Sequence, residues 1–324
     1  MTITMSPATT TRGDGRPHVP VLAREVVDLL GPAGGGTHVD LTVGYGGHAA
    51  LMLDADPDRT LLGIDRDPEA LAVAAEVLRP YGSRVVLRHA VSDRLAEVLG
   101  AEGVTRARTI LADLGVSSPQ IDDADRGFSY VRSGPLDMRM DRTGGETAFE
   151  RLARISEEEL AAALRRFADE PHARRIASRI VDAQPRTTGD LAAIVREAVP
   201  AARRRRGDPA RNAFQAIRIL VNDEIGVLER TLDVALDRLE PGGRLGVISF
   251  HSGEDRLVKH RFRAEATGAC SCPPGLPCVC GAAPTVRLVT RKAVVASPRE
   301  TTLNPRSSSA RLRVVEALGS GEAP

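Results

Sequence analysis

The 324-residue sequence contains no tryptophan, and aromatic residues make up only 3% of it. Aromatic platforms on which the bases of single-stranded nucleic acid stack are therefore scarce. No stretch approaches the ~18 consecutive apolar residues of a membrane helix, and the N-terminus lacks the apolar core of a secretory signal. We expect a cytoplasmic protein with no membrane partner, and a disordered tail over residues 1–17.

Cysteine is scarce too, and all four cysteines lie in one segment, as Cys270-Ser-Cys272 and Cys278-Val-Cys280. A secreted disulfide scaffold would spread them through the chain. Two interpretations stay open: a zinc site with four thiolates, although C-x-C is tighter than the usual C-x2–4-C spacing, and a reduced, proline-rich surface loop. None of these cysteines follows a core strand, which disfavours a thiol nucleophile. We assign no metal ligand from the sequence.

The net charge is only +1, so overall charge identifies no partner. Local charge says more, because residues 203–206 are four consecutive arginines and further clusters lie at Arg165–Arg166 and Arg174–Arg175. Arginine suits bidentate contacts with phosphate. The alternative is a solvated helix face.

What the chain does contain is an alternation of apolar strands and helices, which indicates parallel βαβ units. We predict strands at residues 37–43, 60–64, 85–89, 109–114 and 244–250, and helices at 21–30, 49–53, 68–79 and 256–264. One long helix is expected at 212–239, ended by two glycines at 242–243. Two late strands, 288–295 and 310–316, are expected to pair. Only helices are indicated from about 147 to 202. The whole suits a seven-strand α/β sheet over residues 18–121 and 210–318, with a mostly helical insertion at 122–209 and a short tail at 319–324.

A glycine-rich turn, DLTVGYGGH at residues 40–48, joins the first strand to a helix. Such a turn brings backbone close to a ligand and aims helix N–H groups at an anion. Its Gly44-x-Gly46-x-x-Ala49 spacing also fits the dinucleotide fingerprint, although a plain tight turn is the alternative. Asp65 ends the next strand, where an acidic side chain can accept both hydroxyls of an adenosine ribose. The alternative is a helix cap, a role that suits Asp67 better.

Two polar loops follow later strands. Asp113 ends the fourth strand, and Ser117-Ser118-Pro119-Gln120 comes directly after it. This position matches the Asp/Asn/Ser-Pro-Pro-aromatic loop of methyltransferases that act on exocyclic amines, with Gln120 in place of the aromatic residue. The alternative is an ordinary strand-to-helix connection. His251, in SFHS at 249–252, can contact a base or phosphate, or it can belong to a helix cap built by Ser252 with Asp255.

Seven stretches of the chain together resemble the bacterial RsmH (MraW) family of 16S rRNA (cytosine-N4)-methyltransferases. They are HVPVL, DLTVGYGGH, GIDRDPEAL, DLGVSSPQIDDADRGFSYVRSGPLDMRMD, RNAFQAIRILVNDE, PGGRLGVISFHSGEDRLVKHRFR and NPRSSSARLRVVE. The resemblance runs from about His18 to Glu316, and the stretch from DLGVSSPQ to MRMD is the most specific part of it.

The resemblance implies a class I S-adenosylmethionine-dependent methyltransferase fold with a helical insertion, and methylation of the N4 amine of cytidine 1402 in 16S rRNA of the small ribosomal subunit. By position, it implies cofactor-binding roles at Gly46, Gly47, His48, Asp65, Ser92, Asp113 and Gln120. Ser92 stands where the family often has an aromatic residue near the adenine, and Tyr45 where it usually has alanine.

Asp113 and the Ser117-Ser118-Pro119 segment are our catalytic candidates, because acceptors must hold the N–H groups of the target amine. The helical insertion, Arg203, Arg204, Arg205, Arg206 and His251 are the candidates for RNA contact. Two alternatives remain: an NAD-dependent oxidoreductase, and an RNA-binding assembly factor without enzymatic activity. The oligomeric state, a homodimer included, stays open.

Overall fold

The computed structural model describes residues 20–205, 207–270, 272 and 279–319, with the backbone alone at Arg203 and Arg204. The chain forms two compact units, residues 1–115 with 227–324, and residues 116–226. The tail predicted at 1–17 lies outside the described residues, as does all but Gly319 of the tail predicted at 319–324. Among the helices described, none combines the length and the apolar character that crossing a membrane requires.

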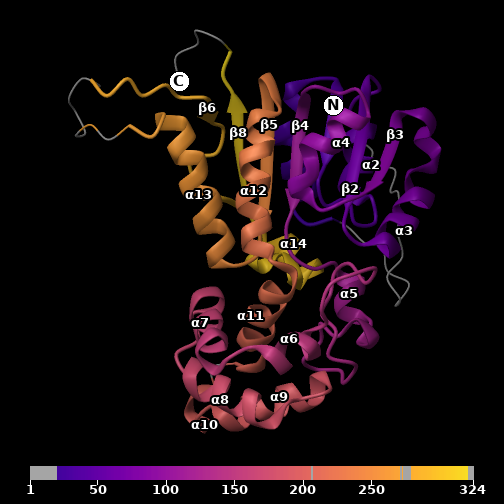
Figure 1. The fold of residues 1–324 in the computed structure, drawn as a ribbon. Helices are drawn as coiled ribbons and strands as arrows, with labels where there is room; N and C mark the ends of the chain where they lie inside the picture. The colour runs from indigo at the N-terminus through magenta and orange to yellow at the C-terminus, as the bar shows by residue number, and fades with distance from the viewer. Residues whose placement is uncertain (1–19, 206, 271, 273–278, 320–324) are drawn as a thin grey trace. The chain divides into compact units, whose positions relative to one another are not determined.

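An eight-stranded sheet forms the centre of the first unit (Figure 1). Its order is β3-β2-β1-β4-β5-β8-β6, with β7 also paired to β8. Strands β1 to β5 are parallel, and β8 runs antiparallel to its neighbours β5, β6 and β7. The strands are β1 (Gly36–Asp40), β2 (Arg59–Asp65), β3 (Val85–His89), β4 (Ala107–Asp113), β5 (Leu239–Ser249), β6 (Val286–Leu288), β7 (Val294–Val295) and β8 (Arg311–Ala317).

The expected α/β class, a mostly parallel sheet with a helical insertion, is confirmed, but the expected count of seven strands was wrong. The strand predicted at 288–295 is divided into β6 and β7. Val289 and Thr290 both donate their N–H groups to the Val314 carbonyl, at 3.0 and 3.1 Å, which interrupts the regular ladder there. The predicted pairing of the two late segments is confirmed, since β6 and β7 both pair with β8.

Helices cover both faces of this sheet, as its nearly continuous apolar strands require. Along β4, Ile110 and Ala112 pack in one cluster with residues of α4, α12 and α13, whereas Leu111 packs in another with residues of α1 and α2. Leu61 of β2 packs with α2 and α3. The helices are α1 (Ala23–Leu30), α2 (Gly47–Asp54), α3 (Pro68–Leu78), α4 (Leu95–Ala101), α12 (Glu224–Asp237), α13 (Ser252–Thr267) and α14 (Pro298–Leu303).

Strands β1 and β4 mark the point where the strand order reverses. From β1 the chain continues to β2 and β3 on one side, while β4 leads to β5 on the other. In doubly wound α/β sheets, ligands bind outside the carboxyl ends of the strands at such a point. The residues that end β1, β2 and β4 are therefore the first place to look for a site.

The second unit is helical and has its own core. Its helices are α5 (Ser118–Asp122), α6 (Ala148–Arg154), α7 (Glu157–Ala168), α8 (Ala173–Ala183), α9 (Thr188–Ala198), α10 (Ala201–Arg204) and α11 (Ala210–Asn222). This unit spans 116–226, wider than the helical insertion predicted at 122–209. The difference at the C-terminal side arises because Phe214 and Ile217 of α11 are buried in the same core as Leu160 and Leu164 of α7.

The long helix predicted at 212–239 was wrong, because α11 and α12 are separate. Asp223 adopts a left-handed conformation, with φ 48°, and donates its N–H to the Ile219 carbonyl, which closes α11. The glycines at 242–243 do not end a helix either. They lie inside β5, where a Cβ on Gly243 would come within 2.9 Å of the Arg108 carbonyl oxygen.

Candidate functional site

Three aspartates end three adjacent parallel strands: Asp40 on β1, Asp65 on β2 and Asp113 on β4. Because parallel strands end at the same edge of a sheet, these carboxyl groups gather at the point where the strand order reverses. Asp65 and Asp113 were predicted from the sequence. Asp40 was missed as a site residue, although it ends its strand just as the other two do.

Asp40 is the most deeply buried of the three, with 1% of its surface exposed. Burial raises the pKa of its carboxyl group to about 7, against the opposing effect of the nearby His48 and of a hydrogen bond from the Thr42 N–H. Thr42 reaches the neighbouring strand as well, since its Oγ1 accepts the Asp113 N–H at 2.7 Å. Near neutral pH, the buried carboxyl group of Asp40 is therefore partly protonated.

Asp65 holds the glycine turn in place. Its two carboxylate oxygens accept the N–H groups of Gly44, at 2.8 Å, and of Asp67, at 2.9 Å. Burial raises the pKa of Asp65 to about 6 in spite of these bonds. Asp67 is the N-cap of α3 and accepts the Glu69 N–H at 3.0 Å, as predicted. The helix-capping residue is thus Asp67, whereas Asp65 ends β2 and does not cap α3.

The glycine turn needs glycine for local reasons. Gly44 and Gly46 have φ angles of +52° and +81°, which only glycine adopts without strain, and Gly46 caps α2. A Cβ on Gly47 would lie 2.6 Å from Cγ of Pro20. Pro20 belongs to the HVPVL segment, so two stretches of the family resemblance pack together. The interpretation as a tight turn is therefore correct. The turn also leads directly into the N-terminus of α2, close to the strand-end carboxylates.

His48 and Asp113 face one another, with His48 Nε2 3.5 Å from Asp113 Oδ2. Both ring nitrogens of His48, and Oδ1 of Asp113, are buried without a hydrogen-bond partner among the described residues. Leaving such groups unpaired costs on the order of 1–3 kcal/mol each. Buried polar atoms left open in this way indicate a place for a polar ligand.

The other predicted cofactor and catalytic residues have defined structural roles. Ser117 and Gln120 form a capping box around α5: the Ser117 N–H donates to Gln120 Oε1 at 2.9 Å, and the Gln120 N–H to Ser117 Oγ at 3.4 Å. The S-x-x-Q spacing signalled this box, and the sequence analysis overlooked it. Ser118 and Pro119 form the first turn of α5. Ser92 follows β3, and its Oγ lies 2.8 Å from Thr231 Oγ1.

His251 caps α13, so the helix-cap interpretation is correct with the residue shifted by one from Ser252. Its Nδ1 accepts the Glu254 N–H at 3.3 Å, and Glu254 in turn accepts the His251 N–H at 3.2 Å. Only 9% of the His251 side chain is exposed. This geometry accounts for His251 without any RNA, and its contact with RNA remains a prediction.

The four-arginine run is only partly described. Arg206 lies outside the described residues, and α10 carries Arg203 and Arg204, of which the backbone alone is described. Arg205 is exposed. The second unit presents further exposed arginines: Arg165, Arg166, Arg174, Arg175, Arg179, Arg186 and Arg211.

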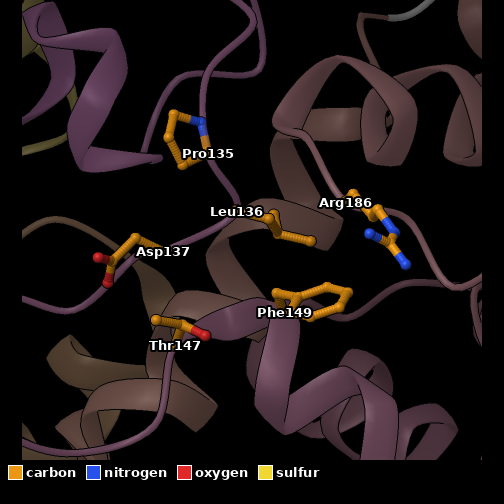
Figure 2. Close-up of a pocket in the computed structure, with 6 residues that line it drawn as sticks. All are labelled: Pro135, Leu136, Asp137, Thr147, Phe149 and Arg186. Atoms are coloured by element: carbon orange, nitrogen blue, oxygen red, sulfur yellow. The ribbon is translucent and has the colours of Figure 1, made fainter.

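A pocket of about 310 Å³ lies on the second unit. It is lined by Pro135, Leu136, Asp137, Thr147, Phe149 and Arg186. Figure 2 shows Arg186 and Phe149 on one side of Leu136, with Asp137 and Thr147 on the other. The Arg186 guanidinium lies 5.8 Å from the centre of the Phe149 ring. An aromatic ring beside an exposed cation is a surface that suits a nucleotide. No local sequence pattern predicts this pocket.

A model of the MraW methylase family matches residues 15–318 of the chain. The chain belongs to the MraW methylase family. Ribosomal RNA small subunit methyltransferase H of Symbiobacterium thermophilum is 50% identical over 312 residues, covering 94% of this chain and 98% of that protein. The protein of the same name from Trichlorobacter lovleyi is 47% identical over 309 residues, covering 93% and 98%. The strand-end aspartates and the glycine turn therefore lie within the part of the chain that the family model matches.

Proposed function

We propose that this chain is an S-adenosylmethionine-dependent methyltransferase of small-subunit ribosomal RNA. The observation that carries the proposal is the match of nearly its whole length, at 50% identity, to a protein named ribosomal RNA small subunit methyltransferase H. The strand-end site supports it independently, since its groups suit an adenosyl cofactor. An NAD-dependent oxidoreductase and a non-enzymatic assembly factor are both disfavoured by that match.

The residues at the strand ends fit the methyl donor. The α2 N-terminus, at Gly46 and Gly47, suits a carboxylate. The buried atoms His48 Nδ1 and Asp113 Oδ1, which have no hydrogen-bond partner among the described residues, suit the polar groups of an amino acid. Asp65 accepts the N–H groups of Gly44 and Asp67 on its two oxygens, and a carboxylate has about four acceptor sites, so it suits ribose hydroxyls as well. Ser92, at the end of the neighbouring β3, is assigned to the adenine end. Gln120 is assigned beside the cofactor on the family resemblance alone.

When bound, S-adenosylmethionine supplies an electrophilic methyl group on sulfur. The finer proposal is that the acceptor is the exocyclic N4 amine of cytidine 1402 in 16S rRNA. The lone pair of that amine is delocalised into the ring, so the protein has to hold its N–H groups and take up the proton that is released. Asp113 is the proposed acceptor, assisted by the Ser117–Pro119 segment. Preorganised acceptors of this kind contribute through positioning and electrostatics.

Two assays test the proposed class of function. Calorimetric titration of the full chain should show binding of S-adenosylhomocysteine and no binding of NAD. Small ribosomal subunits and naked 16S rRNA, each given a labelled methyl donor, should then show which of the two is the substrate. Binding of NAD in preference to S-adenosylhomocysteine would support the oxidoreductase, and RNA binding without cofactor binding would support the assembly factor.

RNA docking is proposed to lie on the helical unit, as the sequence analysis suggested for Arg203–Arg206. The exposed Arg175 and Arg179 on one face of α8, with no carboxylate partner among the described residues, add to that proposal. The Phe149–Arg186 pocket provides a place for a base beside a phosphate.

Replacing Arg203–Arg206 with serine tests the docking proposal. It should weaken RNA binding and flatten its salt dependence, because each lost phosphate contact lowers the slope of log K against log[salt] by roughly 0.7–0.9. A matched control is Arg79→Ser, an exposed arginine of the first unit. An unchanged slope in the Arg203–Arg206 variant would contradict docking through this run.

A further inference from the structure

Three described cysteines lie together in the loop between α13 and β6. The Sγ atoms of Cys270, Cys272 and Cys280 all lie within 4.8 Å of one another, and those of Cys270 and Cys280 are 3.6 Å apart. A tetrahedral zinc ion with Zn–S bonds of about 2.3 Å holds its sulfurs about 3.8 Å apart. A disulfide needs about 2.05 Å. The separations therefore suit three ligands of one ion better than an oxidised pair.

The fold fixes both ends of the segment that carries these thiols. At the exit of α13, the Ala269 N–H donates to the Ala264 carbonyl at 2.8 Å and the Cys270 N–H to the Thr267 carbonyl at 3.1 Å. On the return, the Thr285 N–H donates to the Glu265 carbonyl at 3.0 Å. The two ends touch at Gly268, where a Cβ would come within 2.5 Å of the Ala283 nitrogen.

The loop also orients a donor toward sulfur. The Val279 N–H donates to Cys272 Sγ at 3.4 Å, which joins the residue before Cys280 to the thiol of Cys272. Apolar burial does little here, since 89% of Val279 is exposed and Cys280 is exposed as well. Residues as exposed as Val279 and Cys280 need another source of order, and a bound metal ion is one that small cysteine-rich segments use.

We propose that Cys270, Cys272 and Cys280 bind a structural zinc ion that clips the loop between α13 and β6. Thiolate ligands in tetrahedral arrangement select zinc among the common divalent ions. The tight C-x-C spacing spoke against zinc, yet the sulfurs of Cys270, Cys272 and Cys280 lie within range of one ion. Cys278 lies outside the described residues and is no part of this assignment.

Elemental analysis of the full chain, purified without tag or chelator, tests the site. We expect about one zinc per chain, and a several-fold lower content in Cys272→Ser and in Cys280→Ser. Val279→Ser is the matched control in the same loop, because it keeps all the thiols and the backbone N–H, and it should retain the metal. The wild-type chain reconstituted with cobalt should show the intense thiolate-to-cobalt absorption of a tetrahedral sulfur site.

Because the cysteine variants can fail to fold, the wild-type chain alone also decides the matter. Blocking its thiols with a mercurial reagent should release the zinc. A chain that holds less than about a tenth of an equivalent after purification in zinc-containing buffer, zinc that survives thiol blocking, or an intact mass showing a disulfide between Cys270 and Cys280 would each overturn the proposal.

Discussion

At the scale of single residues, Asp113 is the side chain on which the proposed chemistry depends most. It ends β4, faces His48 Nε2 at 3.5 Å, and has one carboxylate oxygen buried without a partner among the described residues. Replacing it with asparagine keeps its shape but removes the negative charge and much of the proton affinity. The fold should therefore survive the change, while methyl transfer should not.

We predict that Asp113→Asn lowers the rate of methyl transfer by roughly 10²-fold or more, the range for a lost acid–base or electrostatic group. Steady-state assays on the preferred RNA substrate, with the midpoint of thermal unfolding measured alongside, check this. Asp237→Asn is the control, since Asp237 is an exposed aspartate on α12. Full activity in Asp113→Asn would remove Asp113 from the mechanism.

The burial of Asp40 leads to a prediction about how stability depends on pH. Burial raises its pKa from the ordinary 3.8 of an aspartate to about 7, so between these pH values the carboxyl group ionises in the unfolded chain but stays mostly protonated in the folded chain. The contribution of Asp40 to the free energy of unfolding is fully present below pH 3.8 and is lost as the pH rises to about 7. Asp40→Asn has no proton to lose, so its unfolding free energy relative to wild type should rise across that window by roughly 4 kcal/mol.

Urea unfolding of both chains at a series of pH values measures this difference. A difference that grows with pH and levels off above 7 is the expected result. Parallel curves for the two chains would mean that the folded Asp40 ionises as readily as the unfolded one.

At the scale of elements, the turn before α2 combines tight backbone packing with the proposed cofactor site. A Cβ on Gly47 would lie 2.6 Å from Pro20, whereas a Cβ on Gly100, inside α4, would meet no atom within 4 Å. We predict that Gly47→Ala lowers the unfolding free energy by about 1–3 kcal/mol through overpacking, and that Gly100→Ala raises it by about 0.4–1 kcal/mol. Chemical denaturation of both variants checks this, and a stabilised Gly47→Ala would show that Pro20 moves aside without cost.

Most elements were predictable from the sequence because their signals are local. The apolar runs that became β2 and β3, and Pro68 at the start of α3, needed no tertiary information. The division of 212–239 into α11 and α12 was not predictable in this way, since the apolar pattern continues through Asp223 and the break depends on its left-handed conformation. The interruption between β6 and β7 likewise depends on the partner strand, since Val289 and Thr290 both donate to the Val314 carbonyl.

At the scale of the whole molecule, the site could be predicted only in part. Sequence order predicts that Asp65 and Asp113 end strands, but not that Asp40 is buried between them with a raised pKa. That effect comes from burial, which no local pattern reports. The capping box of Ser117 and Gln120 follows from the S-x-x-Q spacing, a local signal present in the sequence. The close approach of the three thiols is likewise a tertiary feature that local spacing does not report.

The identity of the methylated nucleoside tests the proposed function most directly. Small ribosomal subunits or 16S rRNA lacking the modification are treated with the full chain and S-adenosylmethionine, digested to nucleosides and analysed by mass spectrometry, with the modified position mapped on the RNA. We predict N4-methylcytidine at position 1402, formed by the wild-type chain and not by Asp113→Asn. A methyl group on carbon 5 or on a ribose hydroxyl, or at another nucleotide, would contradict the proposed amine chemistry and its target.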